Sequence, residues 1–429
     1  MSSKINKKIA IIGLGYVGLP LAIEFGKYKK VIGFDIDETR ISDLRELNDY
    51  TGECSSEEIA SSKNLKFTNK LNDLARCSIY ILTVPTPVDK SNTPDFAPLL
   101  SACKSISKVL NKGDLIIFES TVFPGATEEV CIPYLESCSD LKYKKDFHCG
   151  YSPERINPGD KVHKLPDIKK ITSGSTPSIA KEVDDLYKKI IRAGTYLAPS
   201  IKVAEAAKVI ENTQRDLNVA FVNELSMIFS LLEIDTLEVL EAASTKWNFL
   251  NFKPGLVGGH CIGVDPYYLT HKAKEVGYSP EVILAGRRIN DRMGEHITSL
   301  IIKKAVSKGI NLSSCKVLML GFTFKENCPD IRNTKVYDIY QEFRKYNLKP
   351  KVYDPHADPK EVFREYGIKS VRSLNLEKAH KEFDIVILSV AHNKFIEIGK
   401  KKIKSVLKNK SLFVDLKGIF LKGDSDLRL

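Results

Sequence analysis

The stretch from residue 255 to residue 269, GLVGGHCIGVDPYYL, places a cysteine in a glycine-rich turn and a carboxylate four residues later. Glycines allow backbone conformations closed to other residues and let a ligand come close to the chain. Asp265 and Pro266 are typical of a helix N-cap followed by proline at the first helical position. A helix beginning there would favour the thiolate of Cys261, which is the nucleophilic form of cysteine. We interpret Cys261 as a candidate nucleophile; the alternative is a buried cysteine, with Asp265 serving only as a cap.

A nucleotide-binding pattern near the start of the chain gives such a nucleophile a context. An apolar strand at 8–12 runs into Gly13-x-Gly15-x-x-Gly18, a helical pattern follows, and a second strand at 31–34 ends at Asp35. Strand, glycine turn, helix, strand and acid in this order form the dinucleotide-binding fingerprint. The pyrophosphate would rest on the helix N-terminus. Asp35 would accept hydrogen bonds from the ribose hydroxyls and repel a 2′-phosphate, so the pattern predicts NAD rather than NADP.

Further alternation of strands and helices follows in the first part of the chain. Apolar strands at 79–84, 115–118 and 147–151 each run into a polar, proline-bearing loop, and the first of these loops is Pro85-Thr86-Pro87. Ligands of open α/β sheets bind at the carboxyl ends of such strands. Residues 1–200 therefore read as one doubly wound α/β domain.

Two long helical patterns occupy the middle of the chain, 201–309. The first, from 201 to 232, carries Glu205, Lys208, Asn212 and Arg215 at intervals of three or four residues, which places them on one helix face. Periodicity alone favours a solvated face over the wall of a site. The second helix, about 280–308, carries Arg287, Arg288 and Asn290. Two such helices between α/β domains suit a connector or a dimer interface.

The last part of the chain returns to strand–helix alternation. Apolar strands are expected at 317–320, 350–353, 385–388 and 412–414, and no second GxGxxG accompanies them. Residues 310–429 read as a smaller Rossmann-like domain. The expected fold class is α/β, with two Rossmann-like doubly wound domains joined by a central helical dimerisation region.

Bulk composition excludes several classes of protein. The chain has 429 residues, a net charge of +11 and nine scattered cysteines without a CxxC pair. Scattered cysteines favour a reducing compartment, here the cytoplasm, over disulfides or structural zinc, and no metal site is expected. No segment approaches the ~18 uninterrupted apolar residues of a membrane-spanning helix. No nucleic-acid motif accompanies the positive charge. The charge is explained by the attraction of an anionic nucleotide or by a solvated, lysine-rich surface.

These motifs together resemble the UDP-glucose/GDP-mannose dehydrogenase superfamily. The resemblance covers nearly the whole chain, in the family's order: GLGYVGLP, Asp35, TVPTP, STVFPG, YSPERINPG, the helix with Lys208 and Asn212, GGHC, FTFKENCPDIR and VYDP. It implies an N-terminal NAD domain, a central dimerisation region and a C-terminal domain for the uridine nucleotide. It also implies oxidation of carbon 6 of the sugar from alcohol to carboxylate in two NAD-dependent steps.

The resemblance also implies roles for single residues. Cys261 would form a thiohemiacetal and then a thioester, while Lys208 and Asn212 would stabilise the oxyanion. Asp265, with Thr121 nearby, would order a water or act as a base, and Glu154 would assist thioester hydrolysis. NAD binding falls on Gly13, Gly15, Tyr16, Val17, Gly18, Asp35, Arg40, Pro85, Thr86, Thr121 and Arg332. Substrate binding falls on Glu154, Arg155, Asn157, Lys208, Asn212, Arg215, Phe252, Gly255, Arg287, Phe324 and Lys325.

One departure from the family pattern bears on the sugar. UDP-glucose enzymes carry phenylalanine and lysine between the cysteine and the aspartate, whereas Ile262-Gly263-Val264 stands here, and His260 replaces their serine. These forms resemble the branch that acts on UDP-N-acetylhexosamines and makes uronic acids for bacterial capsules and O-antigens. We expect UDP-GlcNAc or UDP-GalNAc as substrate, without a choice of epimer; UDP-glucose and UDP-ManNAc are the alternatives.

Arg287 in the second helix has two interpretations. In this family an arginine at the matching place reaches the substrate of the neighbouring subunit of a homodimer. The alternative is a surface arginine on a solvated helix.

Two other classes of function compete with this interpretation. A nucleotide-sensing protein on a Rossmann scaffold would need the glycines and Asp35 but not Cys261 with Lys208. A single-step epimerase or 4,6-dehydratase would need a Tyr-x-x-x-Lys pair after the fingerprint, and the first domain does not show one.

Overall fold

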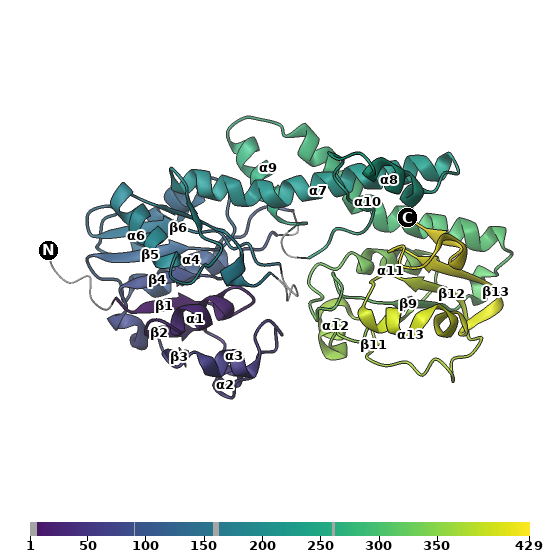
Figure 1. Ribbon diagram of the computed structural model, residues 1–429, viewed down its shortest axis with the longest axis horizontal. Coiled ribbons are helices and arrows are strands. Elements are labelled where there is room, and N and C mark those ends of the chain that lie inside the picture. Colours follow the sequence, from purple (N-terminus) through teal and green to yellow (C-terminus); the bar gives the residue numbers. More distant parts are fainter. Residues whose placement is uncertain (1–6, 90, 158–162, 260–261) are drawn as a thin grey trace. The chain divides into compact units, whose positions relative to one another are not determined.

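The computed structural model describes residues 7–89, 91–157, 163–259 and 262–429. The chain divides into two compact units (Figure 1). The first unit contains Met1–Asn212 and Val264–Ser279, and the second contains Thr213–Gly263 and Pro280–Leu429. The expected central region is shared between these units, and the division into three domains remains a prediction.

The first unit is built on an eight-stranded sheet with the strand order β3-β2-β1-β4-β5-β6-β7-β8. All neighbouring strands are parallel except β6 and β7, which are antiparallel. The strands are β1 (Ile9–Ile12), β2 (Val31–Phe34), β3 (Leu65–Thr68), β4 (Ile79–Leu82), β5 (Asp114–Phe118), β6 (Phe147–Tyr151), β7 (Lys170–Gly174) and β8 (Thr195–Leu197). The strand expected at 79–84 ends two residues early, at Leu82.

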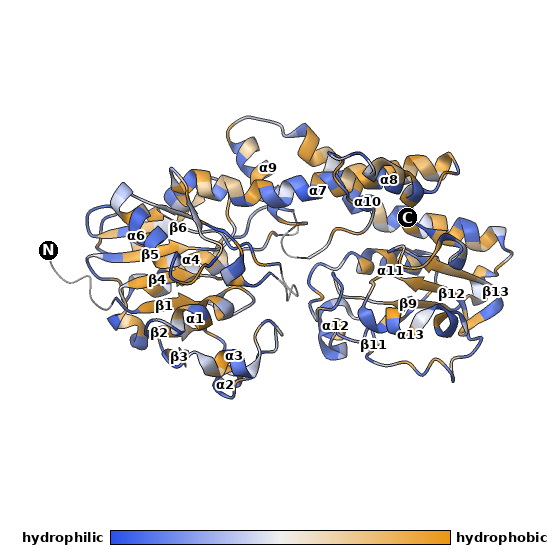
Figure 2. Ribbon diagram, viewed as in Figure 1, coloured by the Kyte–Doolittle hydropathy of each residue, from blue (hydrophilic) through white to orange (hydrophobic). Residues whose placement is uncertain are grey.

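Helices cover both faces of this sheet. Successive side chains of a strand point to opposite faces, so Ile9 and Ile11 pack with helices α1 and α6, while Ala10 and Ile12 pack with α4 and α5. The helices of the unit are α1 (Gly18–Gly26), α2 (Glu38–Arg45), α3 (Ser56–Ser61), α4 (Ala97–Ser107), α5 (Ile132–Cys138), α6 (Pro177–Tyr187) and α9 (Asp265–Glu275). The buried strands form the apolar interior visible in Figure 2.

The second unit repeats the plan on a smaller scale. Its six strands have the order β11-β10-β9-β12-β13-β14 and are all parallel. They are β9 (Val317–Leu320), β10 (Lys351–Tyr353), β11 (Ser370–Val371), β12 (Phe383–Leu388), β13 (Leu407–Asp415) and β14 (Leu427–Arg428). Its helices are α8 (Thr236–Ser244), α10 (Glu281–Ser307), α11 (Val336–Lys345), α12 (Pro359–Tyr366) and α13 (Asn393–Lys404). The expected fold class, mixed α/β with two Rossmann-like sheets and a central helical region, is confirmed.

The two long helices match the prediction from periodicity. Helix α7 (Ile201–Leu231) and helix α10 (Glu281–Ser307) begin and end within one residue of the expected bounds. Helix α7 contributes its residues up to Asn212 to the first unit and the rest to the second.

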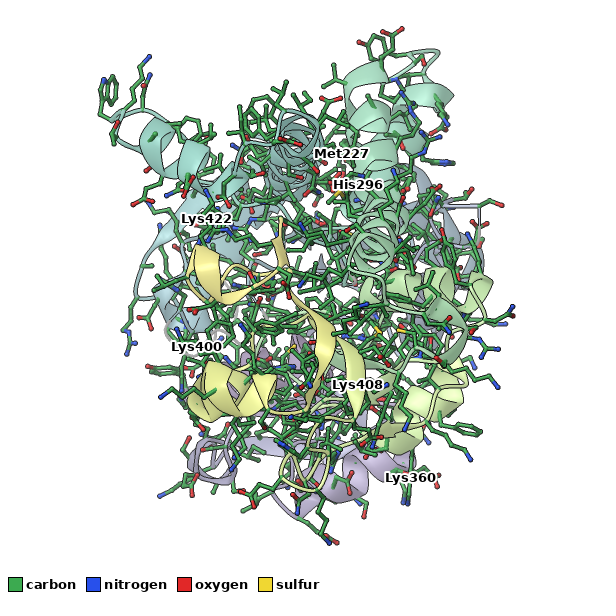
Figure 3. All side chains as sticks on the ribbon, turned by 90° about the vertical axis from the view of Figure 1, so that its right-hand side faces the viewer. Met227, His296, Lys360, Lys400, Lys408 and Lys422 are labelled. Carbon is green, nitrogen blue, oxygen red and sulfur yellow. The ribbon has the colours of Figure 1, made fainter. Side chains whose placement is uncertain are left out.

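Lysines on the surface account for part of the positive charge. In the second unit Lys400, Lys408 and Lys422 lie at the surface (Figure 3), where they pair with Asp424, Asp384 and Glu238. Such exposed pairs contribute little to stability. Within the described ranges, none of the helices has the length and apolar character needed to cross a membrane.

Candidate active site

The glycine turn after β1 is shaped to receive a ligand backbone. A Cβ on Gly18 would lie 1.8 Å from the carbonyl oxygen of Gly13, so only glycine fits where the helix meets the turn. A Cβ on Gly15 would meet no atom within 4 Å, so the open side of the turn is at Gly15. The turn leads into α1, whose N-terminus favours a phosphate group. These observations fit a dinucleotide held along residues 13–18.

Asp35 stands at the carboxyl end of β2, beside this turn. Its carboxylate is half-buried and accepts hydrogen bonds from Leu14 N (2.8 Å) and Asp37 N (3.0 Å). The acid is thus oriented by backbone at the edge of the glycine turn, as a ribose-binding acid requires.

Arg40 supports the turn from within the protein. Its side chain is buried and donates to the Leu14 carbonyl oxygen from Nε (2.8 Å) and Nη2 (2.7 Å). It also forms an ion pair with Asp49 (2.8 Å) and lies over the ring of Tyr50. The role of Arg40 in contacting NAD remains a prediction.

Lys208, Asn212 and Asp265 come together in the first unit. Asn212 Nδ2 donates to Asp265 Oδ2 at 2.5 Å, and Lys208 Nζ lies 3.8 Å from the same oxygen. Lys208 and Asp265 are both buried. The interpretation of Asp265 as an N-cap was wrong: Val264 is the N-cap of α9, and Asp265 is its first residue. The carboxylate turns toward α7, where an amide and an ammonium group bind it.

Two neighbours fix these elements. Tyr268 on α9 donates its hydroxyl to the carbonyl oxygen of Pro87 (3.1 Å), which ties the helix to the loop after β4. Glu205, one turn before Lys208, accepts from Gly125 N (2.5 Å) and Thr127 N (2.9 Å), and burial raises its pKa to about 7. The solvated face favoured by periodicity is therefore wrong for Glu205 and Lys208, although Arg215 is exposed.

Glu154 follows β6 and is held by a buried cluster. Its Oε1 accepts from Arg155 N (2.5 Å) and from Ile156 N. Its Oε2 lies 3.4 Å from Nζ of Lys170, which donates to Glu119 Oε2 at 2.5 Å. Both Lys170 and Glu119 are fully buried, so the ammonium holds two carboxylates in place.

The charges in this cluster are set by burial and by each other. Burial disfavours the charged form of Lys170, but Glu119 and Glu154 outweigh it and raise its pKa above the ordinary value. Burial, offset in part by Lys170, raises the pKa of Glu119 to about 7. Lys170 therefore stays protonated, and Glu154 keeps a cationic neighbour.

The remaining predicted residues of the first unit line the same carboxyl ends. Thr86 donates its hydroxyl to the Thr121 carbonyl oxygen (2.7 Å), which joins the loops after β4 and β5. Arg155 pairs with Glu211 on α7 at 2.8 Å, between Lys208 and Asn212 in the sequence. Tyr16 and Val17 lie half-buried in the glycine turn, and Pro85 and Asn157 are exposed.

Gly255 and Arg287 belong to one polar network in the second unit. Asn223, on α7, accepts from Gly255 N (2.8 Å) and donates to Gly255 O (3.0 Å). It also donates to Asn290 Oδ1 (2.8 Å), and Asn290 donates to Asp216 Oδ1 (2.7 Å). Asp216 in turn accepts from Arg287 Nη1 (2.6 Å). Arg287 is buried, so its interpretation as a solvated surface arginine was wrong.

The other predicted residues of the second unit lie on loops. Phe324 and Lys325 stand half-buried in the loop after β9, and Phe252 is half-buried before Gly255. Arg332 binds Asp330 through Nε (2.9 Å) and Nη2 (2.6 Å). Cys261, the predicted nucleophile, and His260 lie outside the described residues.

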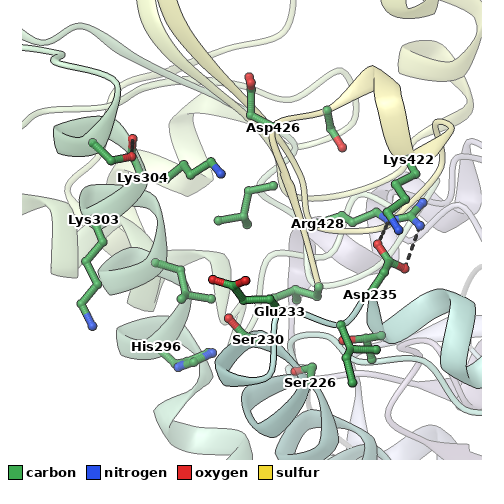
Figure 4. Close-up of a pocket in the computed structure, with 17 residues that line it drawn as sticks. Ser226, Ser230, Glu233, Asp235, His296, Lys303, Lys304, Lys422, Asp426 and Arg428 are labelled. Carbon is green, nitrogen blue, oxygen red and sulfur yellow. Dashed lines mark hydrogen bonds and ion pairs between the residues drawn. The ribbon is translucent and has the colours of Figure 1, made fainter.

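The second unit also contains a cavity of about 700 Å³ between α7, α10 and the end of the chain (Figure 4). Lys303, Lys304 and His296 line it, and Arg428 pairs there with Asp235 at 2.7 Å. No residue that the sequence marked for chemistry lines this cavity.

Several supporting residues were not found from the sequence. Lys170, Asp216, Asn223 and His392 are buried polar residues whose partners lie on other elements. Asp354 and Asn290 belong to stretches that were noted without a role for either residue. The available signal was a polar residue at or near the end of a strand for Lys170, Asp354 and His392, and a polar residue inside a long helix for Asp216, Asn223 and Asn290. Neither signal identifies the partner.

Comparison with known proteins is consistent with this arrangement. Residues 7–191 match the NAD binding domain of the UDP-glucose/GDP-mannose dehydrogenase family, 202–292 its central domain and 318–422 its UDP binding domain. The chain is 55% identical over 422 residues to a UDP-N-acetyl-D-glucosamine 6-dehydrogenase of Pseudomonas aeruginosa, covering 98% of this chain and 99% of that one. A protein of the same name from Salmonella typhi is 54% identical over 98% of both chains.

Solved structures give the same relationship. The UDP-D-ManNAc dehydrogenase of Pyrococcus horikoshii superimposes with a TM-score of 0.88, at 28% identity, over 98% of both chains. The chain is an oxidoreductase with an NAD binding domain, and it belongs to the UDP-glucose/GDP-mannose dehydrogenase family.

Proposed function

We propose that this enzyme oxidises carbon 6 of UDP-N-acetylglucosamine to the carboxylate in two NAD-dependent steps. The observation that carries the reaction type is the cluster of Lys208 and Asn212 on Asp265 at the start of α9. Cys261 precedes that helix by four residues in the sequence. A cationic and an amide donor suit the oxygen of an aldehyde and of its tetrahedral adduct.

The residues divide the work as follows. NAD, held along residues 13–18 and by Asp35, would accept the hydride in each step. Lys208 and Asn212 hold the oxygen on carbon 6. The Cys261 sulfur bonds to carbon 6 of the aldehyde, and the carbonyl oxygen takes up a proton. Oxidation of this adduct gives a thioester, whose carbon–sulfur bond water then cleaves.

Thioester cleavage falls to Glu154. Its carboxylate is fixed by two backbone N–H groups and by Lys170, so one geometry is available for orienting a water. Asp265, held by Asn212, is placed to accept a proton from a hydroxyl or from water. Thr121 lies on the loop after β5, and its carbonyl oxygen accepts a hydrogen bond from the Thr86 hydroxyl. It therefore lies at the same carboxyl edge of the sheet as the loop after β4.

Replacement of Cys261 tests the covalent route. Cys261→Ala removes the only group assigned to hold the aldehyde, so formation of uronate should fall by about 10⁴-fold or more. Cys261→Ser should give a slow or trapped ester. Mass spectrometry of the intact enzyme and of the products measures both. Uronate production by Cys261→Ala near the wild-type rate would contradict the proposal.

The sugar is proposed from the relatives named UDP-N-acetyl-D-glucosamine 6-dehydrogenase, at 55% and 54% identity. Gly263 and Val264, in place of the bulkier Phe-Lys pair, leave room for a 2-acetamido group. A panel of UDP-GlcNAc, UDP-GalNAc, UDP-ManNAc and UDP-glucose, with NADH followed at 340 nm and products identified by NMR, tests the choice. The highest kcat/KM should belong to UDP-GlcNAc. A preference for UDP-glucose would overturn the sugar assignment and leave the reaction type intact.

We also propose a cytoplasmic homodimer in which Arg287 serves the neighbouring subunit's substrate. The second unit exposes Phe221, Ile228 and Leu231 on α7 and Leu232 directly after it, an apolar surface that a second copy would cover. Eight free cysteines among the described residues suit a reducing compartment.

Mixed dimers test the shared site. Cys261→Ala and Arg287→Ala, refolded together, place both lesions in one site of a mixed dimer and none in the other, so about a quarter of wild-type activity should return. The inactive homodimers refolded alone are the control. No recovery despite mixed dimers detected by native mass spectrometry would place Arg287 in its own subunit's site or outside it.

A further inference from the structure

The loop after β9 carries Phe324 and Lys325, the residues assigned to the uridine nucleotide. The loop cannot be held by sheet pairing, because it leaves the sheet at Gly321. Its backbone is held instead by two buried side chains from neighbouring strand ends. Asp354 follows β10, and His392 follows β12. Both are at most 1% exposed.

Asp354 binds the first half of the loop. Its Oδ2 accepts from Phe322 N (2.6 Å), Thr323 N (3.0 Å) and His392 Nε2 (3.0 Å). Its Oδ1 accepts from His356 N (2.8 Å) and Ala357 N (2.9 Å). This carboxylate is saturated with donors and has no exposure to a ligand.

His392 binds the second half of the loop. Its Nδ1 accepts from Asn327 N at 3.0 Å. A backbone N–H can only donate, so Nδ1 carries no proton and the imidazole is neutral with its proton on Nε2. That proton points between Asp354 Oδ2 and the hydroxyl oxygen of Thr323, 3.2 Å from Nε2. The Thr323 hydroxyl donates to the carbonyl oxygen of Lys325 at 2.9 Å.

The geometry points to His392 as a positioning residue for nucleotide binding. One neutral imidazole joins Asp354, which binds the backbone just before the Phe324–Lys325 segment, to Asn327, which follows that segment. The Thr323 hydroxyl extends this restraint to the Lys325 carbonyl oxygen. The loop is thereby ordered before a ligand arrives, which lowers the entropic cost of binding. The inference rests on the proposed function in one respect: Phe324 and Lys325 contact the uridine nucleotide.

Two substitutions of His392 test its hydrogen bonds to Asn327 and to Asp354 one at a time. His392→Asn keeps an acceptor near the place of Nδ1 and loses the bond to Asp354. His392→Gln keeps a donor near the place of Nε2 and loses the bond to Asn327. Each should weaken UDP binding by about five- to tenfold, the effect of one lost hydrogen bond, and raise the KM for UDP-GlcNAc in parallel. The Kd for NAD and kcat at saturating substrate should stay within about twofold.

Isothermal titration calorimetry of the full-length enzyme with UDP and with NAD measures these effects. The same substitutions at His380, an exposed histidine of the same unit, are the control. Unchanged UDP affinity in both folded His392 variants would overturn the inference, as would an equal loss of NAD affinity.

Should the His392 variants fail to fold, Thr323→Val keeps the imidazole and removes the hydroxyl that links His392 Nε2 to the Lys325 carbonyl oxygen. A weaker UDP affinity supports the inference, and an unchanged affinity overturns it. Failure of the proposed function has a different signature, because wild-type enzyme would then produce no uronate from UDP-GlcNAc and NAD. UDP affinities of wild type and variants are measured without turnover and decide the inference separately.

Discussion

Each unit places an aspartate at the carboxyl end of the second strand of its sheet, and the two are used differently. Asp35, after β2, is half-buried and bound by the N–H groups of Leu14 and Asp37. Asp354, after β10, is buried and binds four backbone N–H groups and His392. An acid at this position therefore does not by itself identify a ribose-binding site. Its remaining exposure decides whether it can meet a ligand.

The turn after β1 in the first unit and the turn after β9 in the second unit also differ in how open they are to a ligand. In the first unit the turn is open at Gly15, where a Cβ would meet no atom within 4 Å. In the second unit Phe322 and Thr323 occupy the turn, and both are fully buried. Side chains thus fill the turn of the second unit, whereas the first unit's turn is open where we propose that the pyrophosphate binds. The proposed nucleotide contacts of the second unit, Phe324 and Lys325, accordingly lie on the loop beyond this turn.

The largest effect is expected at the glycine turn of the first unit. Gly18→Ala would press a methyl group against the Gly13 carbonyl oxygen. It should lower the free energy of unfolding of that unit by about 3 kcal/mol and abolish NAD binding. Gly15→Ala, with open space around it, should change stability by less than about 1 kcal/mol. Thermal unfolding of both variants measures the contrast, and equal losses would remove the distinction between the closed and open sides of the turn.

Neutralising the saturated aspartate should destabilise the second unit. Asp354→Asn removes the charge that five donors bind, at a cost of about 2–4 kcal/mol in unfolding free energy. Glu365→Gln, an exposed change in the same unit, is the control. Urea unfolding gives both values. If Asp354→Asn is as stable as wild type, Asp354 does not hold the turn in the way described.

Low pH should destabilise the second unit because it protonates Asp354. Burial opposes the charge on Asp354, but hydrogen bonds from His392 and the backbone outweigh it and lower its pKa well below the ordinary value. Its contribution is therefore fully present above the unfolded pKa of about 4 and is lost as pH falls below that value. The slope approaches about 1.4 kcal/mol per pH unit for this one proton. Asp235, Glu326 and Asp424 of the same unit also have lowered pKa values and contribute to the loss in acid. Urea unfolding between pH 5 and pH 3, chosen as about one unit either side of that pKa, should therefore show a steeper slope in wild type than in Asp354→Asn.

The smallest effect concerns cofactor choice. Asp35 should give NAD an advantage over NADP of at least about tenfold in kcat/KM, equivalent to about 1.4 kcal/mol. Asp35→Ala should narrow that advantage, whereas stability should change less than in Asp354→Asn. Initial rates with both cofactors decide it. Equal rates with NAD and NADP in wild type would contradict the ribose role of Asp35.

Features that depend on interactions between neighbours in the chain could be predicted from the sequence, and features that depend on distant residues could not. Strand–turn–helix patterns and the spacing of Gly13, Gly15 and Gly18 depend on neighbours in the chain, so the fold and the helices at 201 and 281 were predictable. The N-cap at Asp265 and the solvated face at Lys208 were wrong, because each side chain binds the other's helix. The partners of Lys170 and His392 lie on loops that follow other strands, far away in the sequence, and no local pattern indicates them.

The stoichiometry of the reaction tests the central claim most directly. Two hydrides leave one carbon, so each uronate formed from UDP-GlcNAc should accompany about two NADH. NADH is measured at 340 nm and uronate by mass spectrometry in the same sample of wild-type enzyme. A ratio near two with no released aldehyde is the predicted result. A ratio near one, with free aldehyde or a keto-sugar as product, would contradict the account.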